Sequence, residues 1–216
     1  MAKSDVYDTK EKESFSLKGM LGDLMDIIEA VIVSMFVILM MFVYVLRPVD
    51  VEGPSMMPTL LDRDKVIMWK LGYTPKAGDI VIVDDYHSFT FADDTNTTPV
   101  ETDALDIRIV KRVIATAGQT VDIDFHEGKV YRDGELLDEP YIAAPTTLDE
   151  GAFRYPITVP EGYVFIMGDN RPNSTDSRDS RVGLVPVEQV LGHVVMRIYR
   201  DPECCNGFYE WFDLLA

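Results

Sequence analysis

The chain has 216 residues, of which 47% are hydrophobic and 26% charged, enough apolar material for a folded core in about one and a half domains of typical size. Its 37 acidic and 20 basic residues give a net charge of −17, which argues against a nucleic-acid-binding protein and against attachment to anionic lipid through a polybasic patch. Two cysteines, adjacent at Cys204-Cys205, exclude a disulfide-rich scaffold and a four-cysteine zinc site.

The first predicted element is an apolar helix near the N-terminus. Residues Ala30–Leu46 carry no charge, and with residues 27–29 the run reaches 20 residues, about the length that crosses a ~30 Å hydrocarbon core. A buried core helix would be amphipathic, whereas this run is apolar on all sides. A cleavable signal peptide would have a shorter apolar region followed by a small-x-small site near its end, and residues 44–53 offer none. We therefore predict an uncleaved transmembrane helix over residues 27–47, ended by Pro48.

Lysines before this helix indicate its orientation. Lys10, Lys12 and Lys18 lie within residues 1–26, and the positive-inside rule places such a segment in the cytoplasm. No second apolar run of this length follows. Residues 48–200 are therefore expected to form one extracytoplasmic domain at the cell membrane, followed by an acidic, aromatic tail at 201–216.

The segments after the helix are short and typical of strands. They are rich in β-branched and aromatic residues and are bounded by Gly, Pro or Asp. A single helical turn is expected at Pro186–Val190, and the polar residues 87–106 are predicted to be an exposed insertion. The pattern predicts an all-β body of folded sheets or an open barrel. The expected strands are Lys65–Trp69, Asp79–Val83, Ile107–Ile114, Val121–Phe125, Lys129–Tyr131, Tyr155–Val159, Tyr163–Met167 and Leu191–Tyr199.

Three histidines offer little sign of chemistry. His87, His126 and His193 lie in a polar loop, a turn and a strand, and they lack the spacing of a metal site. We therefore expect no metal. A Ser-His-Asp triad stays open at this point, because its members can come from anywhere in a chain.

Lys111 stands out within its predicted strand. Alternation places it on one face with Ile107, Ile109 and Val113, while the neighbouring Arg108 and Arg112 take the opposite, solvated face together with Val110. Lys111 is then either an edge-strand lysine that reaches water or a desolvated lysine with a lowered pKa, able to act as a general base.

A serine lies in a stiff turn shortly after the apolar helix. Pro54 and Pro58 restrict the backbone on either side of Ser55, and Gly53 allows another chain to approach closely. The segment is either a rigid exit from the membrane or a presented hydroxyl whose own backbone N–H faces a developing oxyanion. Two methionines, Met56 and Met57, are expected to be exposed beside it and to offer an adaptable apolar surface.

The third segment of interest is a polar loop over Met167–Arg181. It follows a predicted strand and is dense in Asp, Asn, Ser and Arg, so Asx turns and Asp–Arg pairs could hold it without a metal. Its spacing is not that of a calcium loop.

Taken together, these segments resemble bacterial type I signal peptidases. The matching pieces are Gly53-x-Ser55-Met56-x-Pro58-Thr59-Leu60, Gly78-Asp79-Ile80-Val81, Lys111-Arg112-Val113-Ile114-Ala115, and Gly168-Asp169-Asn170-Arg171 through Ser174, Asp176, Ser177 and Arg178. They occur in the family's order behind a single anchor and cover about Pro48–Tyr199. The glycine at position 53 and the single anchor resemble the smaller, Gram-positive-type branch.

The resemblance implies a role for each matching residue. Ser55 would be the nucleophile and Lys111 the general base, with the hydroxyl of Ser174 orienting the lysine. Asp176 and Arg178 would be paired charges that support the loop beneath the site. Because Gly53 stands where some members have a serine, the oxyanion hole would depend on backbone N–H groups, chiefly that of Ser55.

The resemblance also implies a substrate class. Preproteins carrying signal peptides would be cleaved beside the lipid bilayer after small residues at the first and third positions before the cut, with shallow pockets around Met56 and Val110. No cofactor and no nucleic acid are expected. Two other classes are disfavoured. A self-cleaving regulator of the repressor type would need a DNA-binding domain, whereas this chain has a membrane span. A membrane-anchored binding module with a decayed site would not keep all of the matching residues intact.

Overall fold

The computed structural model describes residues 17–92, 96, 98–199 and 213–214. The chain divides into two compact units between Phe42 and Val43, which are described separately. The first holds most of helix α1 (Leu17–Tyr44), in which Gly19–Tyr44 is long and apolar enough to span a membrane, with a mean hydropathy of 2.6 over its most apolar window and none of that window buried. The expected apolar helix is present, with different bounds.

The helix ends earlier than the sequence predicted. It stops at Tyr44, and Leu46–Asp50 form strand β1, so the expectation of a helix that continues to residue 47 is wrong. Strand β1 pairs antiparallel with strand β2 (Lys65–Trp69) along its whole length, from Leu46 opposite Trp69 to Asp50 opposite Lys65. The hydrogen bonds between β1 and β2 are favoured over continuation of the helix through these residues. Pro48 is tolerated in β1 because β1 is an edge strand of the sheet.

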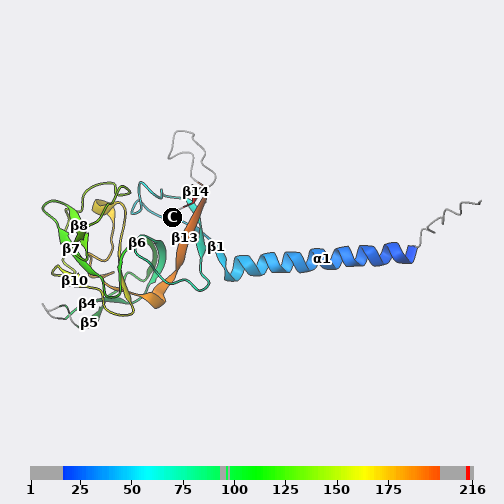
Figure 1. Ribbon diagram of the computed structural model, residues 1–216, viewed down its shortest axis with the longest axis horizontal. Helices are drawn as coiled ribbons and strands as arrows, with labels where there is room; N and C mark the ends of the chain where they lie inside the picture. The colour runs from blue at the N-terminus through cyan, green and yellow to red at the C-terminus, as the bar shows by residue number, and fades with distance from the viewer. Residues whose placement is uncertain (1–16, 93–95, 97, 200–212, 215–216) are drawn as a thin grey trace, which may run out of the picture. The chain divides into compact units, whose positions relative to one another are not determined.

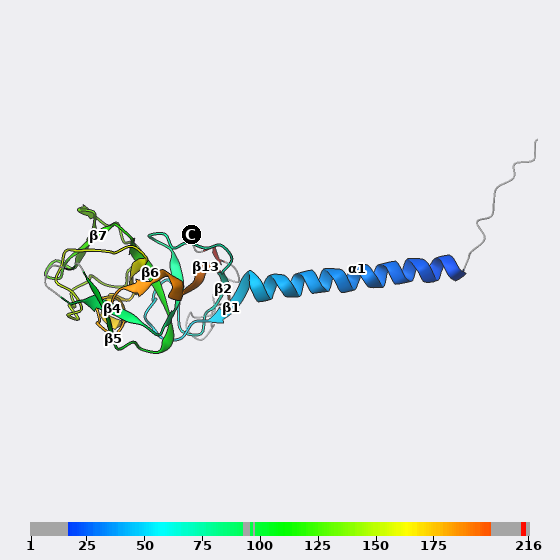
Figure 2. The same ribbon diagram turned by 90° about the horizontal axis from the view of Figure 1, so that it is seen from below.

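The second unit is built from three antiparallel sheets (Figure 1). The largest has the order β1-β2-β13-β3-β6-β11-β12 with β14 added to β13, a four-stranded sheet has the order β10-β7-β8-β9, and β4 and β5 form a hairpin. The four-stranded sheet lies at the opposite end of this unit from β1 and β2 in both views (Figures 1 and 2). The bounds are β3 Ile80–Asp85, β4 Ser88–Phe91, β5 Pro99–Thr102, β6 Ile107–Thr116, β7 Thr120–Asp124, β8 Lys129–Arg132, β9 Glu135–Leu136, β10 Ile157–Thr158, β11 Tyr163–Met167, β12 Val185–Pro186, β13 Val190–Tyr199 and β14 Asp213–Leu214.

The all-β prediction is confirmed for the described part of the body. Every expected strand is found, and the expected helical turn is a short 3₁₀ helix, Val187–Gln189, with a second one at Arg171–Asn173. The core consists of three clusters of apolar side chains, and the cluster around Val51, Met56 and Leu60 lies directly beneath the turn that carries Ser55. Burial of this turn's apolar side chains fixes its position against the large sheet.

The predicted insertion at 87–106 is only partly exposed. Its ends form the hairpin of β4 and β5, Ser88 is fully buried, and Phe89 and Phe91 pack against the core beside Phe153 and Tyr163. The interpretation as a wholly exposed insertion is therefore wrong, because two aromatic rings among polar neighbours carry enough apolar area to fold the segment back. In the predicted tail, Asp213–Leu214 pair with β13, whereas Cys204-Cys205 lie outside the described residues.

Candidate active site

Three hydrogen bonds fix the backbone of the turn that holds Ser55. Gly53 has a φ of +84°, a conformation that favours glycine, and its N–H donates to Asp62 Oδ1 at 2.8 Å. From the loop after β11, the Asn170 N–H donates to the Ser55 carbonyl oxygen at 3.0 Å, and Asn170 Nδ2 donates to the Pro54 carbonyl oxygen at 3.0 Å. The turn therefore presents the Ser55 hydroxyl in one defined position.

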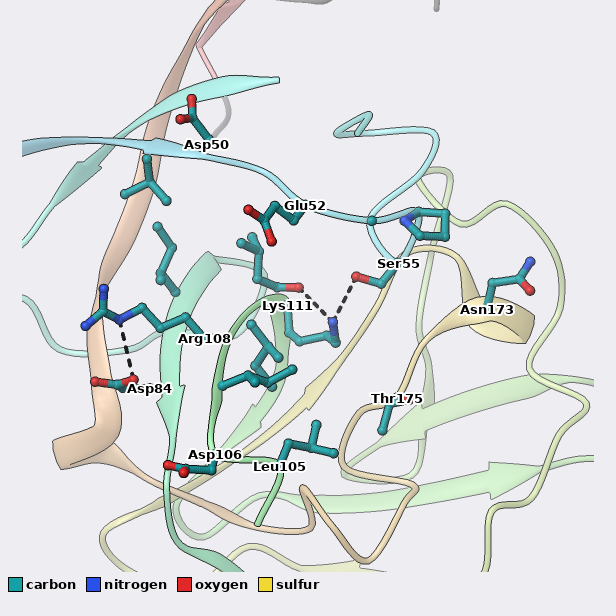
Figure 3. A pocket seen from close by; sticks show the side chains of 17 residues that line it. Asp50, Glu52, Ser55, Asp84, Leu105, Asp106, Arg108, Lys111, Asn173 and Thr175 are labelled. Carbon is teal, nitrogen blue, oxygen red and sulfur yellow. Dashed lines mark hydrogen bonds and ion pairs between the residues drawn. The ribbon is translucent and has the colours of Figure 1, made fainter. Parts of the chain in front are cut away.

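Lys111 on β6 reaches this hydroxyl. Its side chain is 3% exposed, and Nζ donates to Ser55 Oγ at 2.9 Å and to the Val110 carbonyl oxygen at 3.0 Å (Figure 3). The alternative of an edge-strand lysine in water is wrong, because the lysine is buried against the serine turn. The pKa of Lys111 is lowered to about 8 by burial, which disfavours the charged form. The negative charges of Asp176, Asp85 and Asp169 act in the opposite direction and raise it.

The neighbouring Arg112 departs from the prediction. The alternation of β6 placed it on the solvated face, yet it is buried and forms a bidentate ion pair with Asp169, at 2.8 Å and 2.7 Å. Its guanidinium also donates to the Gly78 carbonyl oxygen and stacks on the ring of Tyr141, with 3.9 Å to the ring centroid. Thr59 Oγ1 donates to Asp169 Oδ2 at 2.5 Å, so this ion pair joins the serine turn to the lysine strand.

Asp176 and Arg178 form a second buried ion pair, as the resemblance implied. The two bonds from the guanidinium of Arg178 to the carboxylate are both 2.9 Å, and both side chains are 0% exposed. Asp176 Oδ2 also accepts the Gly168 N–H at 2.9 Å, and Arg178 donates to the Arg171 carbonyl oxygen at 2.7 Å. The pair thus braces the loop that carries Asn170.

Ser174 lies close to the Ser55 turn without a hydrogen bond to Ser55 or Lys111. Its hydroxyl oxygen is buried and has no hydrogen-bond partner in the described part of the chain. A Cβ added to Gly168 would come within 2.2 Å of Ser174 Oγ and 2.5 Å of the Ser55 carbonyl oxygen, so these three residues converge with no room for a larger side chain. The Ser174 hydroxyl therefore lies buried beside the backbone of the turn that carries Ser55.

A cleft of about 990 Å³ opens beside Ser55 and Lys111. Residues 49–50 and 52–55 line one side and β6 residues Ile107–Lys111 line another (Figure 3). Gly53 and Val110 are among the lining residues. Met56 does not line it: its side chain is 1% exposed and belongs to the core, so the expectation of two exposed methionines is wrong for Met56 and holds for Met57, which is 38% exposed. The apolar wall at this point comes from Val110 and the isoleucines instead.

None of the residues lining this cleft is a histidine. His193 stacks on Tyr73 with 4.3 Å between ring centroids, and His87 pairs with Glu101 at the surface. Within the described ranges no group of three or more His, Cys, Asp or Glu side chains is arranged to hold a metal ion. The contact to Ser55 is made by a lysine.

Comparison with known proteins identifies the family. The family model described as "Signal peptidase, peptidase S26" matches residues 24–199, most of the chain. The chain belongs to this family. It is accordingly a serine endopeptidase, and its apolar N-terminal helix makes it a membrane-anchored one.

Relatives of this peptidase include bacterial signal peptidases of similar length. It is 35% identical over 175 residues to "Probable signal peptidase I-1" of Synechocystis sp., covering 80% of this chain and 81% of that protein. It is 32% identical over 181 residues to "Signal peptidase I" of Bacillus licheniformis, covering 79% and 86%. A crystal structure of a signal peptidase I from Enterococcus faecalis is 27% identical, covers 56% of this chain and 97% of its own length, and has a TM-score of 0.39.

Two functional contacts of this peptidase were missed by reasoning from sequence. The roles of Asn170, which fixes the serine turn, and of Arg112 with Asp169, which ties that turn to β6, emerge only in three dimensions. Asn170 and Asp169 both belong to the Gly168–Arg171 motif, which is the signal that could have indicated these contacts. Their partners, Pro54 and Arg112, lie far from the motif in sequence.

Removal of the Asn170 side-chain amide gives a test of this positioning. Asn170→Ala deletes the bond to the Pro54 carbonyl oxygen and keeps the backbone bond to Ser55. A net loss of ~1 kcal/mol corresponds to about fivefold slower cleavage. Steady-state kinetics on a peptide substrate measure it, and a rate equal to that of the unaltered enzyme would contradict a positioning role.

Proposed function

We propose that this enzyme removes N-terminal signal peptides from exported preproteins with a Ser55/Lys111 dyad. The observation that carries the proposal is the 2.9 Å bond between Lys111 Nζ and Ser55 Oγ, made by a lysine that is almost fully buried. A lysine in water would be protonated at neutral pH and could not accept a proton, whereas a pKa of about 8 leaves a useful fraction neutral.

The reaction then follows from this geometry in two steps. Neutral Lys111 accepts the Ser55 hydroxyl proton as Oγ attacks the scissile carbonyl carbon, and the resulting ammonium gives that proton to the leaving amine as the C–N bond breaks. The mature protein leaves and the signal peptide remains as an ester on Ser55. Lys111, neutral again, accepts a proton from the water that attacks the ester, and Ser55 recovers its hydroxyl proton as the acid departs.

The developing oxyanion would face the backbone of the serine turn. In the described part of the chain the Ser55 N–H donates no hydrogen bond, while the Ser55 carbonyl oxygen is already bonded to Asn170. Gly53 supplies no side-chain donor, so stabilisation would come from backbone N–H groups.

The substrate would bind as an added strand along β6. Strand β6 pairs with β3 over Ile107–Arg112, but β11 covers its other edge only from Arg112 onward. In the described part of the chain no strand pairs with the edge at Ile107–Lys111, which lines the cleft, and backbone groups of alternate residues, such as Arg108 and Val110, point to the same side. The Val110 carbonyl oxygen already accepts a bond from Lys111 Nζ. Alternate substrate side chains would then face the apolar wall near Val110, which favours small residues at the first and third positions before the cut.

The membrane topology is part of the proposal. The lysines of residues 1–26 favour a cytoplasmic N-terminus, so that α1 crosses the cell membrane and the catalytic unit is extracytoplasmic. Ser55 follows shortly after the end of α1 at Tyr44, so the dyad is tethered near the bilayer. A preprotein whose signal segment lies in the same bilayer would present its cleavage site there.

Incubation of the detergent-solubilised full chain with a preprotein tests the function. We expect a single cut after a small residue, abolished by Ser55→Ala. Cleavage that persists in Ser55→Ala, or self-cleavage with the preprotein untouched, would contradict the proposal.

Ser174→Ala separates an orienting role from a structural one. The hydroxyl is buried without a partner among the described residues, so its removal should leave thermal stability unchanged or slightly higher. If the hydroxyl bonds the base during catalysis, losing ~1–3 kcal/mol should slow cleavage about 5- to 150-fold and shift the pH profile. A variant that is kinetically silent at every pH would show that Ser174 does not contact the base.

A further inference from the structure

A short turn over residues 61–64 holds the segment that leads to Ser55. The Arg63 N–H donates to the Val51 carbonyl oxygen at 2.8 Å, and the Val51 N–H donates to the Asp64 carbonyl oxygen at 2.8 Å. Both backbone groups of Val51 therefore point toward this turn. Asp64 is fully buried, so the turn is anchored in the body of the catalytic unit.

Asp62 adds one further bond to this contact. Its Oδ1 accepts the Gly53 N–H at 2.8 Å, and this bond comes from a side chain, whereas the bonds to Val51 come from backbone groups. Gly53 has a φ of +84°, and glycine is the residue that moves most freely between backbone conformations. The orientation of the Glu52–Gly53 peptide is therefore set by the carboxylate of Asp62.

The orientation of this peptide decides what Glu52 presents to the cleft. The N–H and C=O of a planar trans peptide point in opposite directions. Because the Gly53 N–H is directed at Asp62, the Glu52 carbonyl oxygen points away from the turn. Glu52 lines the cleft, whereas Val51 is not among the lining residues (Figure 3). In the described part of the chain, neither backbone group of Glu52 forms a backbone hydrogen bond.

The backbone of Glu52 lies across the cleft from β6. Residues Ile107–Lys111 of β6 line one side of the cleft and Glu52 lines the other. A substrate strand added to β6 has a second backbone edge, turned away from β6, whose N–H and C=O groups also need partners. The backbone groups of Glu52 are available to pair with that edge.

We propose that Asp62 is a positioning residue for substrate binding, which holds the backbone of Glu52 toward the second edge of the substrate strand. The inference rests on the proposed function, because it requires a peptide in the cleft. Asp62 acts through Gly53 and takes no part in the hydrogen bond between Lys111 and Ser55. Its loss should therefore weaken substrate binding and leave the chemical step largely unchanged.

Binding of a fluorescent peptide to the Ser55→Ala protein tests the inference without chemistry. The peptide spans a cleavage site with alanine at the first and third positions before the cut, and the full chain is used in detergent. Addition of Asp62→Ala should raise the Kd about three- to tenfold, as expected when one hydrogen bond is lost. Asp62→Asn keeps an acceptor oxygen on the side chain, so its Kd should stay within about twofold of the Ser55→Ala value.

Asp124→Ala is the matched control. Asp124 Oδ1 accepts the backbone N–H groups of His126 at 2.9 Å and Glu127 at 3.0 Å, at the end of β7 in the four-stranded sheet. Its removal takes the same kind of bond from a place outside the cleft. The Kd of the peptide should not change.

Kinetics separate positioning from a purely structural role. In the enzyme with Ser55 intact, Asp62→Ala should raise KM, keep kcat within about twofold and leave the pH at which activity rises unchanged. A role confined to folding would lower thermal stability and leave the Kd of the folded protein as it was.

A backbone ester in the peptide locates the bond. One N–H at a time, from the second to the fifth position before the cut, is replaced by an ester oxygen. Where that N–H donates to Glu52, the ester should weaken binding to the Ser55→Ala protein and have little further effect once Asp62→Ala is present.

Three results would overturn the inference: an equal Kd with and without Asp62→Ala, an Asp62→Asn protein that binds as weakly as Asp62→Ala, or ester effects that add fully to that of Asp62→Ala at every position. If the enzyme with Ser55 intact cleaves no peptide, the proposed function fails and this inference fails with it. If it cleaves the peptide and Asp62→Ala binds as tightly as before, the inference alone fails.

Discussion

Ser55→Ala and Lys111→Ala should each abolish cleavage of a preprotein, and the double variant should be no slower than either single variant. The two side chains share one hydrogen bond and, in the proposed mechanism, act on one proton, so removing either would remove the whole unit. For comparison, loss of a complete catalytic unit in a serine protease costs on the order of 10⁶ in kcat. Steady-state kinetics with purified, detergent-solubilised full chain provide the measurement.

Lys129→Ala is a matched control for the lysine. Lys129 lies at a strand start, is exposed and pairs with Glu127 at 2.6 Å, so its removal takes away the same side-chain type from the surface. We expect this variant to cleave at the rate of the unaltered enzyme. A Lys111→Ala enzyme with a rate close to that of Lys129→Ala would exclude Lys111 as the base.

Asp176→Ala should be the most destabilising single change at the site. It would leave the guanidinium of Arg178 fully buried without its counter-ion and the Gly168 N–H without its acceptor. Breaking a buried ion pair in this way typically costs ~3–5 kcal/mol. Thermal unfolding of the full chain, followed by the loss of its β circular dichroism, measures the effect.

The neighbouring pair of Asp179 and Arg181 provides the control. It has the same sequence spacing and a 2.5 Å ion pair, but Arg181 is largely exposed, so Asp179→Ala should cost no more than ~1 kcal/mol. Equal stability of the two variants would contradict the buried role of the Asp176–Arg178 pair.

Asp176→Ala should also change the pH dependence of activity. Asp176 is foremost among the carboxylates that raise the pKa of Lys111, so its removal should move the rise of activity to lower pH in the enzyme that remains folded.

Sequence reasoning succeeded where local pattern determines geometry. Alternation along Ile107–Val113 placed Lys111 with the apolar set, and this position is indeed buried against the Ser55 turn. The Gly and Pro residues around Ser55 predicted a stiff turn, and the φ of Gly53 agrees with that reading. The strands were predicted for a similar reason, because runs of β-branched and aromatic residues bounded by Gly, Pro or Asp are a local signal.

It failed where a partner distant in sequence decides the outcome. Alternation correctly separated Arg112 from Lys111, but it could not show that Asp169 and Tyr141 cover the face on which Arg112 lies. Met56 was expected to be exposed because it lies in an exposed turn, but its side chain packs into the core beneath that turn. The early end of α1 has the same origin, since β1 exists only because β2 pairs with it.

The account depends most directly on Lys111 being neutral when it acts, and the pH dependence of kcat/KM measures this. Because neutral lysine is the active form and burial lowers the pKa of Lys111 to about 8, kcat/KM should rise with increasing pH through an apparent pKa near 8, well below the ~10.4 of a free lysine. The rise should persist in variants that replace His87, His126 or His193. A rise centred near 6.5 that disappears with one of these histidines, or a profile flat between pH 6 and 10, would contradict the dyad.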